Sequence, residues 1–117
     1  MHVPTEKTQK QRSIIRFRKK LWGDLVRAKN RLKSELKFQG IEVPVNFDNP
    51  HWSHNFLNWI EQQAHNDEDL KDTLLLMLEE VKALRLLLLK TERKLRELMW
   101  TSDYKQNSKL LRELYQV

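Results

Sequence analysis

Basic residues near the start of the chain recur at the spacing of one helix face, and such residues can bind phosphate groups. Arg16, Lys20, Arg27 and Arg31 fall on or near one face of a predicted helix. The basic residues that flank this face are Arg18, Lys19, Lys29 and Lys33. A row of cations neutralises successive phosphates of a nucleic acid and releases counterions, so binding weakens as salt is added. These eight residues are the predicted nucleic-acid-binding residues.

The charge of the chain is unevenly distributed. Residues 1–38 contain twelve basic and three acidic residues, a net charge of +9. The remaining residues contain ten basic and thirteen acidic residues, a net charge of −3. Like charges four residues apart destabilise a helix, so solubility alone explains this excess poorly. The alternative interpretation is a solvated helix face that contacts no nucleic acid.

Side chains suited to metal binding or catalysis are few. His51 and His54 lie three residues apart with Asp48 nearby, but no further well-spaced ligand follows them. We interpret these three as capping or surface residues. Glycine-rich phosphate loops, nucleophile elbows, paired catalytic acids and cysteines are absent from the sequence. The sequence therefore predicts no catalytic residue, no metal site and no cofactor.

Five aromatic residues are candidates for stacking on bases, because every base offers an aromatic face. They are Trp22, Trp52, Phe56, Trp59 and Trp100. The helical spacing of the middle three favours packing in a hydrophobic core instead, where large aromatic side chains contribute most of the buried area.

Composition and length predict one all-α domain. The 117 residues are 39% hydrophobic and 32% charged, with two glycines and three prolines, which leaves little turn chemistry for a sheet. Residues 1–12 are polar, so no secretory signal is expected. Charged residues interrupt the richest apolar stretch, 74–89, so no membrane helix is expected. The absence of cysteine suits a cytoplasmic location.

Start and stop signals divide the chain into helices. Thr5 can cap a first helix, and Gly40 followed by Ile41 is a typical helix end. Asn49 and Pro50 form a second start signal. We predict a long helical hairpin or coiled coil with a short connecting helix and a C-terminal helix. The expected segments are a basic helix at 6–38, a connector at 39–49, an aromatic helix at 50–64, a long helix at 68–101 and a last helix at 104–115.

The long helix carries a heptad series, which is the pattern by which one helix packs lengthwise against another. We call this series the seam, and Thr91 is its only polar member. Its members are Leu70, Leu74, Met77, Val81, Leu84, Leu88, Thr91, Leu95 and Leu98. Further apolar ridges, one of Leu75, Leu78, Leu86 and Leu89 and another of Leu76, Ala83 and Leu87, indicate contact with at least two helices. We expect the first and long helices to pack antiparallel through these ridges, leaving the seam free for a partner chain.

The order of several segments resembles the middle of the insertion sequence 110 family of DEDD transposases. The matching segments are VPTE at 3–6, DLVRAKNRLK at 24–33, GI at 40–41, FDNPHWSHNFLNWI at 47–60, LLLLKTERKLREL at 86–98 and KLLREL at 109–114. In that family a helical region joins a RuvC-like domain with catalytic carboxylates to a domain with a serine nucleophile. Members act as oligomers guided by a structured RNA. The resemblance departs at 115–117, where the family has a Pro-Gly-Val-Gly-type turn.

This resemblance implies a truncated or degenerate transposase that retains the joining region and has no catalytic residue of its own. It also implies guide RNA, transposon DNA and a full-length transposase or a second copy as partners. No membrane or small-molecule partner is expected. Two other interpretations stay open: a purely structural helical module whose basic helix contacts no nucleic acid, and a decay product without activity.

Overall fold

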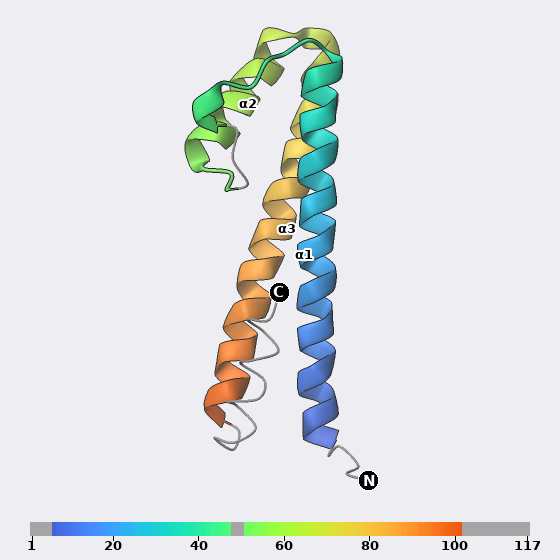
Figure 1. Cartoon of the computed structure of the whole chain (residues 1–117), viewed down its shortest axis with the longest axis vertical. Coiled ribbons are helices and arrows are strands. Elements are labelled where there is room, and N and C mark those ends of the chain that lie inside the picture. The colour runs from blue at the N-terminus through green and yellow to red at the C-terminus, as the bar shows by residue number, and fades with distance from the viewer. Residues whose placement is uncertain (1–5, 48–50, 102–117) are drawn as a thin grey trace. The chain divides into compact units, whose positions relative to one another are not determined.

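The protein is all-α, as the sequence predicts, and α1 (Glu6–Phe38) packs against α3 (Glu68–Thr101). The computed structural model describes residues 6–47 and 51–101 (Figure 1). In chain order the elements are α1 (Glu6–Phe38), the short 3-10 helix η1 (Val45–Phe47), α2 (His54–Asn66) and α3 (Glu68–Thr101). The predicted last helix at 104–115 lies outside the described residues. No helix in the described ranges is both long and apolar enough to cross a membrane.

The chain divides into two compact units, and each contains part of α1 and part of α3. Unit 1 comprises residues 1–23 and 86–117, and unit 2 comprises residues 24–85. Unit 2 also contains α2. Within each unit the segment of α1 packs against the segment of α3.

Local signals explain where α1 ends. Gly40 adopts a φ of +76°, a conformation that glycine tolerates without steric cost. The Gly40 amide donates to the Lys37 carbonyl at 3.0 Å, and the Ile41 amide donates to the Leu36 carbonyl at 2.9 Å. These two bonds form the Schellman motif, which satisfies the last carbonyls of the helix. The range of α1 agrees with the predicted 6–38.

The connecting helix starts later than predicted. We expected it to begin at residue 50, but α2 begins at His54 and ends at Asn66. Ser53 is the N-cap residue, and its Oγ accepts a hydrogen bond from the Phe56 amide at 3.2 Å. Asp67 caps the start of α3, because its Oδ1 accepts a hydrogen bond from the Asp69 amide at 3.0 Å. The 39–49 connector is also not wholly irregular, since it contains η1.

Three helices contribute to the core of unit 2. Its buried apolar side chains are Leu25, Ala28, Leu32, Leu36, Trp52, Phe56, Leu57, Ile60, Ala64, Leu74, Leu78 and Val81. Each fully buried Leu, Ile or Phe contributes about 1.5–3 kcal/mol of transfer free energy. Helix α2 therefore covers apolar surface that a two-helix hairpin would expose.

The core of unit 1 is smaller and partly polar. Ile15 and Leu95 form a buried cluster with Ile14 packed against it. Gln11 and Thr91 are buried in the same unit. The Thr91 hydroxyl donates to the Leu87 carbonyl at 2.7 Å, which satisfies it within α3. Both amide atoms of Gln11 are buried without a hydrogen-bond partner, a destabilising arrangement.

The expectation that the seam stays free for a partner chain was wrong. Leu74, Val81, Thr91 and Leu95 are buried within the chain. The remaining seam residues are half-buried, namely Leu70, Met77, Leu84, Leu88 and Leu98. The exposed apolar side chains of α3 come from the other ridges: Leu76, Leu86, Leu87 and Leu89. The seam is the most continuous apolar face of α3, so its burial removes more apolar surface from water than burial of another face of the helix would.

Candidate nucleic-acid interface

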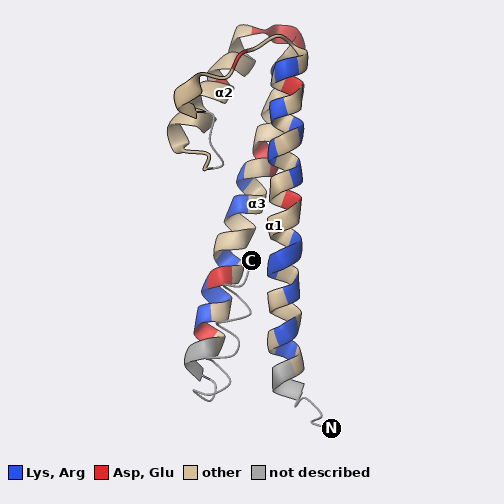
Figure 2. Ribbon diagram, viewed as in Figure 1, with Lys and Arg blue, Asp and Glu red and all other residues tan. Residues whose placement is uncertain are grey.

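The two units differ in net charge. Unit 1 contains fourteen basic and five acidic residues, a net charge of +9, whereas unit 2 contains eight basic and eleven acidic residues, a net charge of −3. In the described ranges, the basic residues of unit 1 lie on both α1 and α3 (Figure 2). The positive charge therefore belongs to a two-helix unit and not to α1 alone.

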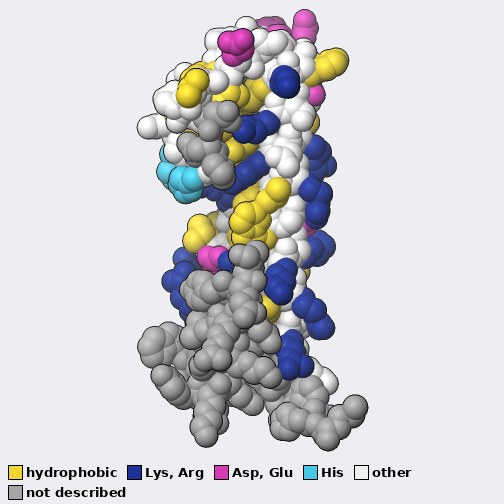
Figure 3. Space-filling model, in the orientation of Figure 1, with side chains coloured by type: hydrophobic (Ala, Val, Ile, Leu, Met, Phe, Trp, Pro, Cys, Tyr) yellow, Lys and Arg dark blue, Asp and Glu magenta, His cyan; other side chains and the backbone are white. Residues whose placement is uncertain are grey.

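Three of the predicted binding residues lie on the exposed surface of α1 in unit 1. Arg16, Lys19 and Lys20 are exposed. Lys and Arg side chains gather along α1 in the space-filling view (Figure 3). The Lys20 ammonium lies 6.0 Å from the centre of the Phe17 ring, a cation–π distance that leaves the charge accessible to solvent. These residues can meet phosphates without any rearrangement of the helices.

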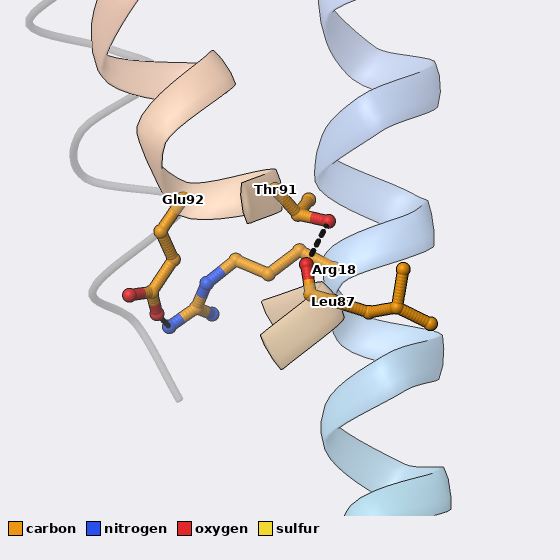
Figure 4. A network of polar contacts seen from close by, with 4 residues as sticks. All are labelled: Arg18, Leu87, Thr91 and Glu92. Atoms are coloured by element: carbon orange, nitrogen blue, oxygen red, sulfur yellow. Dashed lines mark hydrogen bonds and ion pairs between the residues drawn. The ribbon is translucent and has the colours of Figure 1, made fainter. Parts of the chain in front are cut away.

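Arg18 lies between the helices instead of on the binding face, contrary to the prediction. Its side chain is only 12% exposed, and its Nη2 donates to Glu92 Oε1 at 3.1 Å (Figure 4). The pair joins α1 to α3 next to the bond between Thr91 and Leu87. A charge that is partly buried and paired in this way is costly to separate from its partner, so Arg18 is poorly placed to bind phosphate.

Two predicted residues in unit 2 are exposed but make ion pairs. Arg27 pairs with Asp24 on the same helix, and Arg31 Nη2 lies 3.4 Å from Glu80 Oε1 of α3. Exposed pairs of this kind contribute only about 0–1 kcal/mol. A phosphate can therefore replace either carboxylate at little cost.

The side chain of Lys29, another predicted binding residue, lies against Trp52. Its ammonium lies 5.7 Å from the centre of the Trp52 ring, and the guanidinium of Arg85 donates to the Trp52 carbonyl at 2.8 Å. Burial lowers the pKa of Lys29, and the charge of Arg85 lowers it further. Lys29 therefore contributes to packing between α1 and the start of α2.

Lys33 is half-buried and lines an open hollow of about 690 Å³ at the end of α1. Ser34, Lys37 and residues 40–43 line the same hollow. Lys37 is exposed, and the prediction did not name it as a binding residue. Glu42 is among the lining residues, so the hollow carries charges of both signs.

The aromatic residues of unit 2 pack against one another, as the helical spacing favours. Ring centres are 4.8 Å apart for Trp52 and Phe56 and 6.0 Å apart for Phe56 and Trp59. Phe47, which the prediction did not include, stacks on Phe56 at 5.4 Å. In contrast, Trp22 is 44% exposed in unit 1 and is open to a ligand.

The two histidines considered as metal ligands lie at the surface around the start of α2. His51 and His54 are exposed, and Asp48 lies outside the described residues. Within the described ranges no three His, Cys, Asp or Glu side chains come together as metal ligands.

Basic residues of α3 in unit 1 were missed by the sequence prediction. Lys90, Arg93, Lys94 and Arg96 are all exposed. Lys94 lies 3.4 Å from Glu97, so part of this charge is paired. The only sequence signal was four basic residues within seven positions, but interspersed acids made the segment resemble an ordinary solvated face.

Fold and surface charge together define an all-α protein with a cationic two-helix unit. Comparisons with protein-family models, with curated proteins and with solved structures found no match to this chain.

Proposed function

We propose that this chain binds the phosphate backbone of a nucleic acid through the outer face of α1. The observation that carries the proposal is the exposure of Arg16, Lys19 and Lys20 in a unit whose net charge is +9. Because α1 buries its apolar face, these three cations lie on its exposed surface, and Arg16 is about one helical turn, or roughly 5–6 Å, from each of the two lysines. Neighbouring phosphates of one strand lie at a comparable distance, so several contacts can form together.

The resemblance to insertion sequence 110 transposases supports a role in DNA transposition. We propose that the chain acts in the cytoplasm as the joining region of such a protein, with guide RNA or transposon DNA as its nucleic acid. In this proposal it contributes binding and no catalytic residue. Any chain that pairs with it, whether a second copy or a full-length transposase, would use surfaces other than the seam, which packs within the chain.

The test is binding of fluorescently labelled RNA and DNA to the whole chain and to two matched double variants. The variant Arg16→Gln/Lys20→Gln removes two charges from the proposed face. The control variant Lys71→Gln/Lys82→Gln removes two charges from α3 in unit 2. Loss of two phosphate contacts should reduce the slope of log affinity against log salt by about 1.4–1.8. The control should retain the wild-type slope, and equal effects of both variants would contradict the proposed face.

A purely structural module is the second candidate function. It is favoured by the use of Arg18, Arg27 and Arg31 in ion pairs with acidic residues of the chain itself. This candidate predicts no binding to RNA or DNA at low salt and a loss of helical content when the pairs are broken. The same titrations, followed by circular dichroism, decide between the two.

A further inference from the structure

Unit 1 exposes apolar side chains on the same side as the ion pair between Arg18 and Glu92. Trp22 lies four residues after Arg18 on α1, and Leu89 lies three residues before Glu92 on α3. Residues three or four apart share a helix face, so Trp22 and Leu89 lie on the side that the ion pair marks. Leu86 lies one turn before Leu89 on α3. We call Trp22, Leu86 and Leu89 the Trp22 patch.

The Trp22 patch is unusual for a surface made mainly of charged residues. Trp22 is 44% exposed, and both leucines are more than half exposed. The same unit buries Gln11 and Thr91. Exposed apolar clusters with a polar rim commonly mark binding sites, whereas single exposed apolar residues do not.

Cations border the patch on both helices. Lys19 precedes Trp22 by three residues, and Arg93 follows Leu89 by four residues, so each shares a helix face with its neighbour. Both are exposed. The complementary ligand therefore has flat apolar groups with negative charges on either side of them.

A single-stranded nucleic acid has this chemistry. Its unpaired bases present aromatic faces, and its phosphates lie on either side of each base. In a duplex the bases are stacked inside the helix, so the patch would meet phosphates and sugars instead. Stacking of a base on an aromatic side chain is worth about 1–3 kcal/mol.

We propose that the Trp22 patch binds an unpaired base of a single-stranded nucleic acid, while Lys19 and Arg93 contact the flanking phosphates. This inference rests on the proposed function, because it assigns the kind of nucleic acid that the cationic unit prefers. It also assigns residues of α3 a part in binding, in addition to the basic residues of α1.

The experiment compares a labelled oligothymidylate with a duplex of equal phosphate number, using the whole chain. Trp22→Ala should weaken oligothymidylate binding by about fivefold or more, since 1 kcal/mol corresponds to about fivefold. Duplex affinity should change by less than about twofold, and the salt slope should not change, because no cation is lost. Trp22→Phe should restore most of the affinity.

Phe38→Ala is the matched control. Phe38 is an aromatic residue at the end of α1 that is 84% exposed, and it belongs to unit 2. Its loss should leave oligothymidylate binding unchanged. Leu89→Gln provides an independent variant on α3, which should weaken oligothymidylate binding even if Trp22→Ala loses helical content.

The outcomes separate the two proposals. Absence of any binding to either probe at low salt would overturn the proposed function and this inference together. Binding by the wild type that Trp22→Ala and Phe38→Ala weaken equally, or that neither Trp22→Ala nor Leu89→Gln weakens, would overturn the inference alone. If Trp22→Ala dissociated a dimer in sedimentation without changing oligothymidylate binding, the patch would belong to a second copy and the inference would be wrong.

Discussion

Replacing Leu74 by alanine should destabilise unit 2 strongly, because this seam residue is fully buried within the chain. Truncation of a buried leucine removes favourable transfer free energy and leaves a cavity, which together cost about 2–5 kcal/mol. Alanine has a slightly higher helix propensity than leucine, so the change does not weaken α3 itself. The predicted loss is a large fraction of the 5–15 kcal/mol by which small domains are stable.

The assay is urea unfolding followed by circular dichroism at two protein concentrations. Leu76→Ala is the control, since Leu76 lies two residues away on the same helix and is 65% exposed. We expect the control to change the free energy of unfolding by less than about 0.5 kcal/mol. Equal effects of the two substitutions, or an effect of Leu74→Ala that depends on protein concentration, would refute packing of the seam within one chain.

Four further substitutions test contacts within the fold. Glu92→Ala leaves Arg18 partly buried without its carboxylate and should lower the free energy of unfolding by about 1–3 kcal/mol. Glu80→Ala removes an exposed ion pair and should lower it by less than about 1 kcal/mol. Equal shifts in the thermal midpoints of the two variants would contradict this difference. Burial lowers the pKa of Lys29 in the folded chain. Just below the ordinary lysine pKa the unfolded chain therefore binds more protons than the folded chain, so the free energy of unfolding rises with pH in this range. Urea midpoints at about pH 8 and about pH 10 should therefore rise more in the wild type than in Lys29→Met, and parallel changes would refute the assignment. Ser53→Ala removes the N-cap of α2 and should cost about 1 kcal/mol in urea unfolding, and no change would show that the hydroxyl bond contributes nothing.

Local sequence signals predicted the long helices well. The ends of α1 and α3 agree with the predicted ranges because each depends on residues next to it in the chain: Gly40 and Ile41 for the end of α1, and Asp67 for the start of α3. The start of α2 was wrong because two capping signals compete within four residues. Asn49 with Pro50 is the stronger signal in the sequence, but Ser53 caps the helix.

Tertiary contacts limited the prediction of the interface. Periodicity shows that the seam of α3 is buried but not which helix covers it, so a partner chain and α1 were equally compatible with the pattern. Arg18 has neighbours similar to those of Lys19 in the sequence, and only the position of Glu92 on α3 shows that it faces inward. The exposure of Trp22 also depends on tertiary packing, which the spacing of residues along α1 does not give.

The salt dependence of nucleic-acid affinity tests the central claim most directly. The measurement is the dissociation constant of the whole chain for labelled RNA and DNA, from about 50 to 200 mM salt. If Arg16, Lys19 and Lys20 each contact a phosphate, log affinity should fall linearly with log salt with a slope of about −2 or steeper. Affinity that does not change over this range, or no binding at the lowest salt, would contradict the account.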